Sequence, residues 1–354
     1  MSVLGIVIAL FGLSIVVFVH ELGHMLVAKR AGIGVLEFSV GMGPKLFSRR
    51  RKETIYSIRL LPFGGFVRLA GMDDEDGDEV PPEKNYYAKP LRSRLATIAA
   101  GSVFNIVFGF LLFSVLYMFM GVPTLNNRID MVKPDSPAMK AGLLAGDAII
   151  EVNGHAVTHP QDDIITQIHQ SGGQPLVLTF QRAGQTISTN LIPQIKGGKG
   201  IIGVQLEVSY HRYSPIKAVY YGGLATIDKI KLVFVSIKML LSHEAGLKDL
   251  AGPVGIIQLT SFELQRGLVN FIGIMALISI SLGVANLFPF PVLDGGHILF
   301  LAIEAVRGKR LSKKTETFIY NVSAAILIGL MVIIVVNDVL NWQGRVNLLN
   351  QLSK

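Results

Sequence analysis

Four long apolar stretches constrain the fold of this chain more than any other feature. Each is long enough to cross a bilayer core of about 30 Å as an α-helix. They are approximately residues 3–27, 95–120, 268–290 and 317–340. Half of the 354 residues are hydrophobic and only 16% are charged, which is the balance of a membrane protein. The sequence therefore predicts a polytopic α-helical membrane protein with four transmembrane helices.

A fifth stretch, residues 216–241, is apolar but interrupted by charge. Its charged side chains are Lys217, Asp228, Lys229, Lys231 and Lys238. This mixture is typical of an amphipathic helix that lies at the membrane interface. We therefore expect an interfacial region at residues 209–265, between an N-terminal membrane core at residues 1–120 and a C-terminal membrane core at residues 266–354.

Basic residues gather in the loops after the first and third stretches. They are Arg49, Arg50, Arg51 and Lys52 in one loop, and Arg307, Lys309, Arg310, Lys313 and Lys314 in the other. Because Lys and Arg mark cytoplasmic loops, both loops should be cytoplasmic, and residues 121–267 should lie outside the cytoplasm. This placement explains the net charge of +8 better than nucleic-acid binding does.

Two observations narrow the chemistry and processing of the chain. It contains no cysteine, which excludes disulfides, thiolate ligands and a cysteine nucleophile. The N-terminal stretch lacks a basic region before it and is longer than the apolar part of a signal peptide. We therefore expect it to remain in the protein as a membrane span.

The first apolar stretch ends in the sequence His20-Glu21-Leu22-Gly23-His24. In a helix, residues four apart lie on the same face, so His20 and His24 can offer two imidazoles to one metal ion. Zinc with three protein ligands keeps a position for water and lowers its pKa, and the adjacent Glu21 can take up the proton. Because ionisable groups are costly within a membrane, the motif predicts a metalloprotease site with Glu21 as catalytic base.

A third zinc ligand is expected just after the third apolar stretch, in the run Asn286 to Gly296. Two prolines break the helix there, so irregular backbone can bring Asp294 to the metal. Stretches one and three must run in the same direction, as they do in a four-span protein. His297 is a competing ligand, and Asp294 could instead cap a helix. We favour Asp294 because a carboxylate completes a His-His-acid zinc set.

Asn286 carries an amide that could donate a hydrogen bond to a developing oxyanion or hold the substrate backbone. A hydrogen bond between two helices is the alternative role. The sequence leaves both roles open.

Together these residues resemble the site-2 protease family of intramembrane zinc metalloproteases, in its bacterial RseP-like branch. The hallmark motifs are HELGH at residues 20–24 and N-x-x-P-x-P-x-x-D-G beginning at Asn286. Residues 41–44, 61–67 and 251–256 are also similar to family members. The resemblance implies Zn2+ bound by His20, His24 and Asp294, with Glu21 as catalytic base and Asn286 assisting the substrate.

The resemblance also implies that Tyr56 to Gly71 forms a β-hairpin that dips into the membrane and pairs with an unwound substrate strand. Apolar residues flank Pro62-Phe63-Gly64-Gly65 in agreement with this. A protease needs extended backbone, because a helical substrate hides its carbonyls in intrahelical bonds. We therefore expect Gly64 and Gly65 to bind substrate, with an ordinary cytoplasmic hairpin as the alternative.

Residues 121–208 look like one extracytoplasmic PDZ domain. The similarity lies in residues 132–154, followed by a helix near 160–170 and strands at 176–181 and 186–191. Residues 200–204 would be a permuted edge strand whose amides, including that of Gly203, could capture a chain terminus. Better-known relatives carry two PDZ domains, so gating by a tandem pair is not expected here.

The sequence thus predicts a zinc metalloendopeptidase that cleaves in or near the transmembrane segment of single-pass proteins. The resemblance implies substrates already trimmed by another protease, such as anti-sigma factors, or signal-peptide remnants. It also implies the bacterial inner membrane, with the active site toward the cytoplasm. A metal transporter is a rival class, although the internal repeats typical of transporters are not visible. A non-catalytic scaffold presenting the PDZ domain is another.

Overall fold

The computed structural model describes residues 2–72, 81–244, 246 and 251–346. The chain divides into two compact units. The first unit contains residues 1–118 and 215–354, and the second contains residues 119–214.

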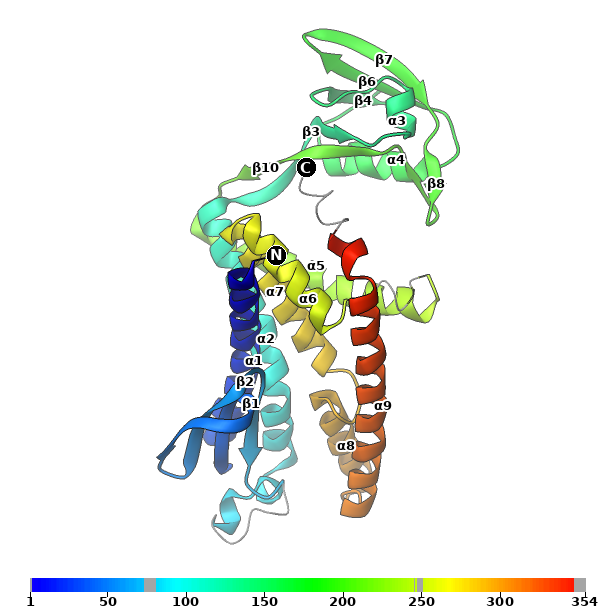
Figure 1. The fold of residues 1–354 in the computed structure, drawn as a ribbon. Coiled ribbons are helices and arrows are strands. Elements are labelled where there is room, and N and C mark those ends of the chain that lie inside the picture. The colour runs from blue at the N-terminus through cyan, green and yellow to red at the C-terminus, as the bar shows by residue number, and fades with distance from the viewer. Residues whose placement is uncertain (1, 73–80, 245, 247–250, 347–354) are drawn as a thin grey trace. The chain divides into compact units, whose positions relative to one another are not determined.

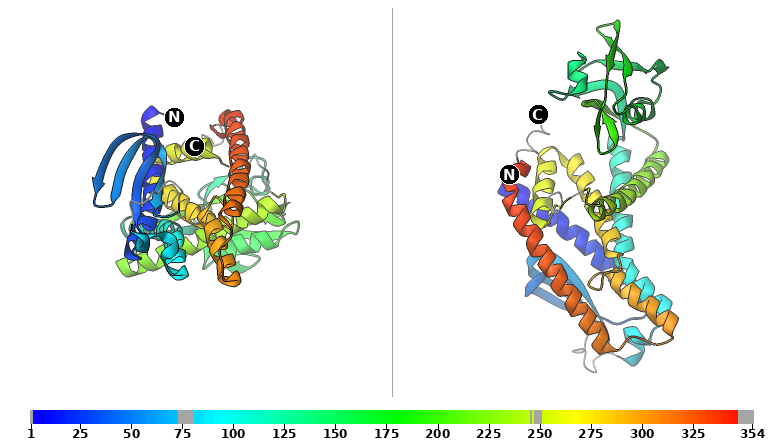
Figure 2. Two further views of the ribbon diagram at one scale, coloured as in Figure 1. Left: turned by 90° about the horizontal axis from the view of Figure 1, so that it is seen from below. Right: turned by 90° about the vertical axis from the view of Figure 1, so that its right-hand side faces the viewer.

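Long α-helices build the first unit (Figures 1 and 2). Within the described residues, four are long and apolar enough to cross a membrane: α1 (Val3–Arg30), α2 (Leu91–Met120), α7 (Leu268–Asn286) and α9 (Lys313–Leu340). Each covers one predicted apolar stretch. α7 ends at Asn286 rather than near residue 290, because Pro289 and Pro291 cannot continue a helix. The early end leaves irregular backbone before the next helix.

The other helices of this unit are shorter or more polar. They are α5 (Pro215–Leu241), α6 (Pro253–Gln265), α8 (Asp294–Arg307) and the single turns η1 (Pro82–Lys84) and η2 (Tyr86–Ala88). α5 coincides with the amphipathic stretch predicted from its mixed composition, and only Ala218, Gly222 and Thr226 of it are buried.

Two long strands, β1 (Val35–Arg51) and β2 (Thr54–Leu69), form a sheet, and β2 packs against α1. Residues 37–40 of β1 pair with residues 65–68 and also with residues 55–58 of β2. The local hairpin expected between Tyr56 and Gly71 is therefore wrong. Its two arms, residues 55–58 and 65–68, do not pair with each other, because β1 lies between them. The chain instead reverses at Lys52, whose φ is 54°. Gly64 (φ 83°) lies where β2 passes from one side of β1 to the other.

Strands dominate the second unit. Its sheet has the order β10-β3-β4-β6-β7, with β5 beside β4, and β8 pairs with β9. The strands are β3 (Val122–Val132), β4 (Ala148–Val152), β5 (His155–Ala156), β6 (Leu176–Arg182), β7 (Gln185–Leu191), β8 (Gln194–Lys196), β9 (Lys199–Ile201) and β10 (Val204–His211). The helical segments are α3 (Pro137–Lys140), η3 (Gln161–Thr166) and α4 (Gln167–Gln170).

The core of the second unit is apolar and includes Ile129, Leu143, Ile149, Leu178 and Phe180. In β6, strand alternation supplies it, since Leu176, Leu178 and Phe180 face inward. The single edge strand expected at residues 200–204 is wrong, because it divides between β9 and β10. Gly203 stands at the break with φ 81°, a backbone conformation that favours glycine.

Candidate metal and catalytic site

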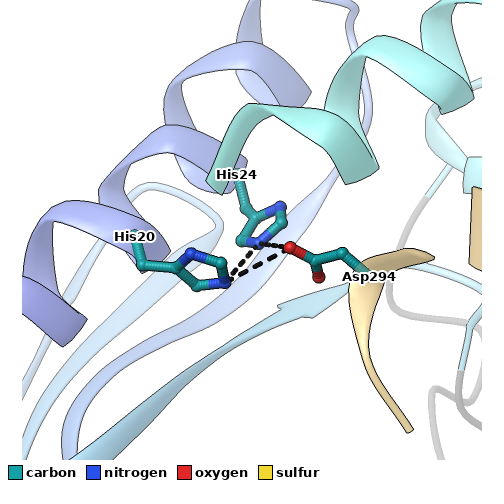
Figure 3. Close-up of side chains that lie close together, drawn as sticks. All are labelled: His20, His24 and Asp294. Atoms are coloured by element: carbon teal, nitrogen blue, oxygen red, sulfur yellow. Dashed lines mark hydrogen bonds and ion pairs between the residues drawn. The ribbon is translucent and has the colours of Figure 1, made fainter. Parts of the chain in front are cut away.

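Three side chains converge in the first unit (Figure 3). His20 and His24 lie one turn apart on α1, and Asp294 is the first residue of α8. Asp294 Oδ2 lies 3.4 Å from His20 Nε2 and 3.5 Å from His24 Nε2. The two Nε2 atoms are 3.2 Å apart, and both histidines are buried. One ligand atom from each residue therefore points to a common centre, which suits a small cation.

A tight turn brings Asp294 to this centre. After α7 ends, the backbone folds back on itself through the two prolines, and Leu293 occupies the N-cap position before α8. A Cβ on Gly295 would stand 2.0 Å from the backbone oxygen of Phe288. A Cβ on Gly296 would stand 2.3 Å from Cα of Pro291. Both positions require glycine because side chains would collide with the turn.

Helix α2 orients the second histidine and the carboxylate. His24 Nδ1 lies 2.9 Å from the carbonyl oxygen of Thr97, which can accept its N–H and so leave Nε2 free for a metal. The hydroxyl of Ser102 donates to Asp294 Oδ2 at 3.0 Å. A Cβ on Gly101 would lie 2.2 Å from His24 Nε2, so only glycine allows this close approach.

Asn105, also on α2, contacts the Nδ1 atom of His20, just as Thr97 contacts that of His24. Its Nδ2 is placed 3.4 Å from His20 Nδ1, while its buried Oδ1 has no partner among the described residues. The oxygen and nitrogen of an amide have nearly the same shape, so the Asn105 amide can be turned by half a rotation without a clash. After this rotation Oδ1 faces His20 Nδ1. Nδ1–H then donates to Asn105, leaving His20 Nε2 free for a metal. The otherwise unpaired oxygen therefore fits a zinc site with two imidazoles and one carboxylate.

Sequence reasoning missed the contributions of α2. Thr97, Gly101, Ser102 and Asn105 all lie within the second apolar stretch. A signal was present, because polar side chains inside a membrane-length stretch usually mark helix contacts or function. The sequence did not indicate which partner each one faces.

The remaining predicted residues of this unit surround the three converging side chains. A Cβ on Gly65 would lie 3.2 Å from Cγ of Glu21, so β2 passes directly beside the expected base. Asn286 Nδ2 lies 3.3 Å from His20 Nε2. Gly64 lies next in β2, where Met42 packs against it.

His297 and Gly203 do not join the three potential ligands. Among the described residues, the potential metal-binding group contains His20, His24 and Asp294. The ring of His297 instead meets that of Phe300, with centroids 6.3 Å apart. Gly203 belongs to the second unit.

Comparisons with known proteins agree on one family. The model of peptidase family M50 matches residues 8–330. The regulator of sigma-W protease RasP of Bacillus subtilis is 30% identical, over 91% of this chain and 95% of its own length. Zinc metalloprotease RasP of Shouchella clausii is 31% identical, over 96% of this chain and 99% of its own length.

A solved structure also matches part of the chain. The PDZ domain of an SdrC-like protein from Listeria monocytogenes is 28% identical, and the match covers 22% of this chain and 84% of that domain. The TM-score is 0.21.

Proposed function

Because the chain belongs to peptidase family M50, it is a zinc metalloprotease of the site-2 protease type, and we propose that it cleaves single-pass membrane proteins that another protease has already trimmed. The observation that carries this proposal is the group of the buried His20 and His24 with Asp294, together with Glu21 on the same membrane-length helix as the histidines. Anti-sigma factors are the favoured substrates, since a relative is named a regulator of sigma-W protease. Signal-peptide remnants are a second substrate class.

In this proposal, His20, His24 and Asp294 hold the zinc ion. The carbonyl of Thr97 and the amide of Asn105 fix the two imidazoles with Nε2 toward the metal position, and Ser102 steadies the carboxylate. When bound, zinc supplies the Lewis acidity that polarises the scissile carbonyl and activates water. Holding all three ligands on helices keeps this geometry rigid.

Glu21 is the proposed proton carrier. It is adjacent to His20 in the sequence, so its carboxylate can accept a proton from the attacking water and return it to the leaving amine. Asn286 lies within hydrogen-bonding reach of His20 and can donate its N–H to the substrate carbonyl oxygen. The glycine at position 65 lets β2 pass directly beside Glu21, which brings the edge of the strand close to the proposed proton carrier.

The proposed substrate platform is the segment of β2 from Gly65 to Leu69. One edge of this segment pairs with residues 35–40 of β1. Among the described residues, no strand pairs with its other edge. An unwound substrate segment can add as a strand on the other side, which would expose its carbonyls to the site. Gly64 and Gly65 suit this role because neither presents a side chain to the incoming backbone.

The chain is an integral membrane protein, given its four apolar helices and its membrane-protease relatives. We place it in the bacterial inner membrane, with the active site toward the cytoplasm and residues 121–208 outside. The basic loops after α1 and α8 support this orientation. Since the chain has no cysteine, single cysteines at Lys309 and Gln185 can test it. An impermeant maleimide on intact cells should label only Gln185→Cys, and labelling of Lys309→Cys would contradict the orientation.

The second unit is proposed to act as a PDZ domain that captures the chain terminus produced by the first cleavage. Its apolar groove of about 280 Å³ is lined in part by Ile164, Ile168, Ile202 and Val204. Gly203 lies at one wall of this groove, where its backbone turns. An extended terminus could lie along β10 with apolar side chains in the groove.

The decisive experiment uses purified, zinc-loaded protein and a tagged single-pass substrate in proteoliposomes. Wild type should cleave the substrate, and Glu21→Gln should lose cleavage while keeping its zinc. Glu244→Gln is the matched control, since Glu244 is exposed just after α5, away from the proposed site and from β10. Equal cleavage by Glu21→Gln, or zinc flux without cleavage, would overturn the proposal in favour of the scaffold or the transporter.

A further inference from the structure

A polar pocket lies at the C-terminal end of α1. It has a volume of about 420 Å³ and is built from the end of α1, the turn between β1 and β2, and the segment before η2. Four cations line it, namely Lys29, Arg51, Lys52 and Lys84, against one acid, Glu53. We call these five residues, with the pocket they line, the basic pocket.

The cations of the basic pocket are mostly unneutralised. Lys84 forms an ion pair with Glu53. Lys29, Arg51 and Lys52 have no carboxylate partner among the described residues. The excess positive charge in a concave site favours an anionic ligand.

Part of the pocket is already held in place. Lys29 Nζ donates to the hydroxyl of Tyr56 at 2.8 Å and lies 5.2 Å from the centroid of its ring. This contact turns the ammonium toward β2. Ile33 and Thr54, each 1% exposed, form a packed floor. Lys89 adds a further cation, because its Nζ lies 3.1 Å from the Cβ position of Gly32.

An apolar stripe leads from α1 to the pocket. Phe11, Ile15, Phe18 and Leu26 are all exposed large hydrophobic residues. They follow helical spacing, and Lys29 lies five turns beyond Phe11 on the same face. A molecule with a phosphate at Lys29 and hydrocarbon chains along this stripe would match both features. A free phosphate would use only the first.

We propose that the basic pocket binds the phosphate headgroup of an anionic phospholipid whose acyl chains run along α1. The proposal rests on the insertion of α1 in the membrane, which belongs to the proposed function. The bound lipid would bridge the end of the helix that carries His20 and His24 to the β1–β2 turn at Lys52, because the pocket draws on both elements. Each Lys near the headgroup contributes roughly 1 kcal/mol of attraction, so the loss of two of them should weaken binding about 30-fold.

The test measures lipid binding directly on zinc-loaded full-length protein in a neutral detergent. The probes are short-chain phosphatidylglycerol, short-chain phosphatidylcholine and inorganic phosphate, detected by native mass spectrometry. The double variant Lys29→Gln/Lys52→Gln removes two cations from the pocket. Lys309→Gln/Lys314→Gln is the matched control, because both lysines are exposed in the other basic loop. Wild type and control should bind phosphatidylglycerol in preference to phosphatidylcholine, and the pocket variant should bind phosphatidylglycerol about 30-fold more weakly.

Several results would overturn the proposal. They are equal binding by the pocket variant, an equal loss in the control, no preference for phosphatidylglycerol, and inorganic phosphate competing as well as the lipid. The last result would assign the pocket to a free anion. Binding is measured without cleavage, so failure of this proposal and failure of the proteolysis experiment are distinguishable.

Discussion

Gly65 and Glu21 lie so close that no side chain fits between them. A Cβ built on Gly65 would stand 3.2 Å from Cγ of Glu21 and 2.8 Å from the carbonyl oxygen of Ser39. The sheet and the HExxH helix therefore meet at the residue proposed to carry the proton. This contact links the proposed substrate strand to the proposed chemistry.

Gly65→Val should reduce cleavage by roughly 10-fold to 100-fold, because it would displace Glu21 or the strand by a fraction of an ångström to an ångström. Zinc content should stay at the wild-type level, since the three proposed ligands lie on α1 and α8. Cleavage rate and bound zinc are measured on the same preparation. Gly273→Val is the matched control, as a Cβ there meets nothing within 4 Å. Wild-type cleavage by Gly65→Val would contradict the close contact.

Asn105→Ala should weaken zinc binding by about 10-fold to 100-fold, which is the usual effect of losing a partner that orients a histidine ligand. The reason is that His20 Nδ1 would lose its acceptor. Affinity is measured by competition with a chromogenic chelator. Ser114→Ala on the same helix should bind zinc normally, since its hydroxyl donates to the backbone oxygen of Phe110 and does not contact the proposed ligands. Normal zinc affinity in Asn105→Ala would mean that Asn105 has a packing role.

The pair Arg94–Glu304 should be a strong tie between α2 and α8. Its two hydrogen bonds measure 2.9 and 2.6 Å, and the side chains are only 6% and 17% exposed. Glu304→Gln should destabilise the fold by about 3 kcal/mol, because it leaves the buried guanidinium without a counter-charge. Unfolding in detergent measures this loss. Glu263→Gln, in the more exposed pair with Arg266, should cost about 1 kcal/mol or less. A similar cost for both would argue against burial as the cause.

Local sequence patterns were enough to predict the four long helices and the spacing of the two histidines. Both depend on short-range periodicity. The approach of Asp294 to the histidines was inferred from the two prolines, which end α7 and leave irregular backbone before Asp294. The sheet register was not predictable in the same way. Residues 37–40 of β1 insert between the two halves of β2, and only long-range pairing decides that arrangement.

The supporting residues of the site also escaped prediction. Asn105 and Ser102 act on side chains from α1 and α8, so their roles depend on which face of α2 meets those helices. α2 is apolar nearly all around, and such a helix gives little sequence indication of its orientation. The three proposed metal ligands could be inferred from the motifs, whereas their hydrogen-bond partners required the packed structure.

In the second unit, Asp147 should make the free energy of unfolding depend on pH in the acidic range. Burial raises the pKa of its carboxyl, but hydrogen bonds from Arg182 and from the amide of Leu144 outweigh burial and hold this pKa below its ordinary value. A lowered pKa in the folded state stabilises the fold above the unfolded pKa of about 3.9, and the contribution disappears as pH falls through the folded value.

Asp147→Asn should therefore lower the free energy of unfolding by about 1–3 kcal/mol at pH 7, through the weaker bond to Arg182, and by progressively less as the pH falls below about 3.9. Hydrogen exchange of β4 and β6 in the full-length protein reports this unit without depending on zinc. Asp130→Asn is the control, since Asp130 is exposed. The variant and wild type should converge as the pH falls, because protonation removes from wild type the same charge that the substitution removes. An equal difference across this pH range would mean that Asp147 stabilises the unit through packing rather than through its charge.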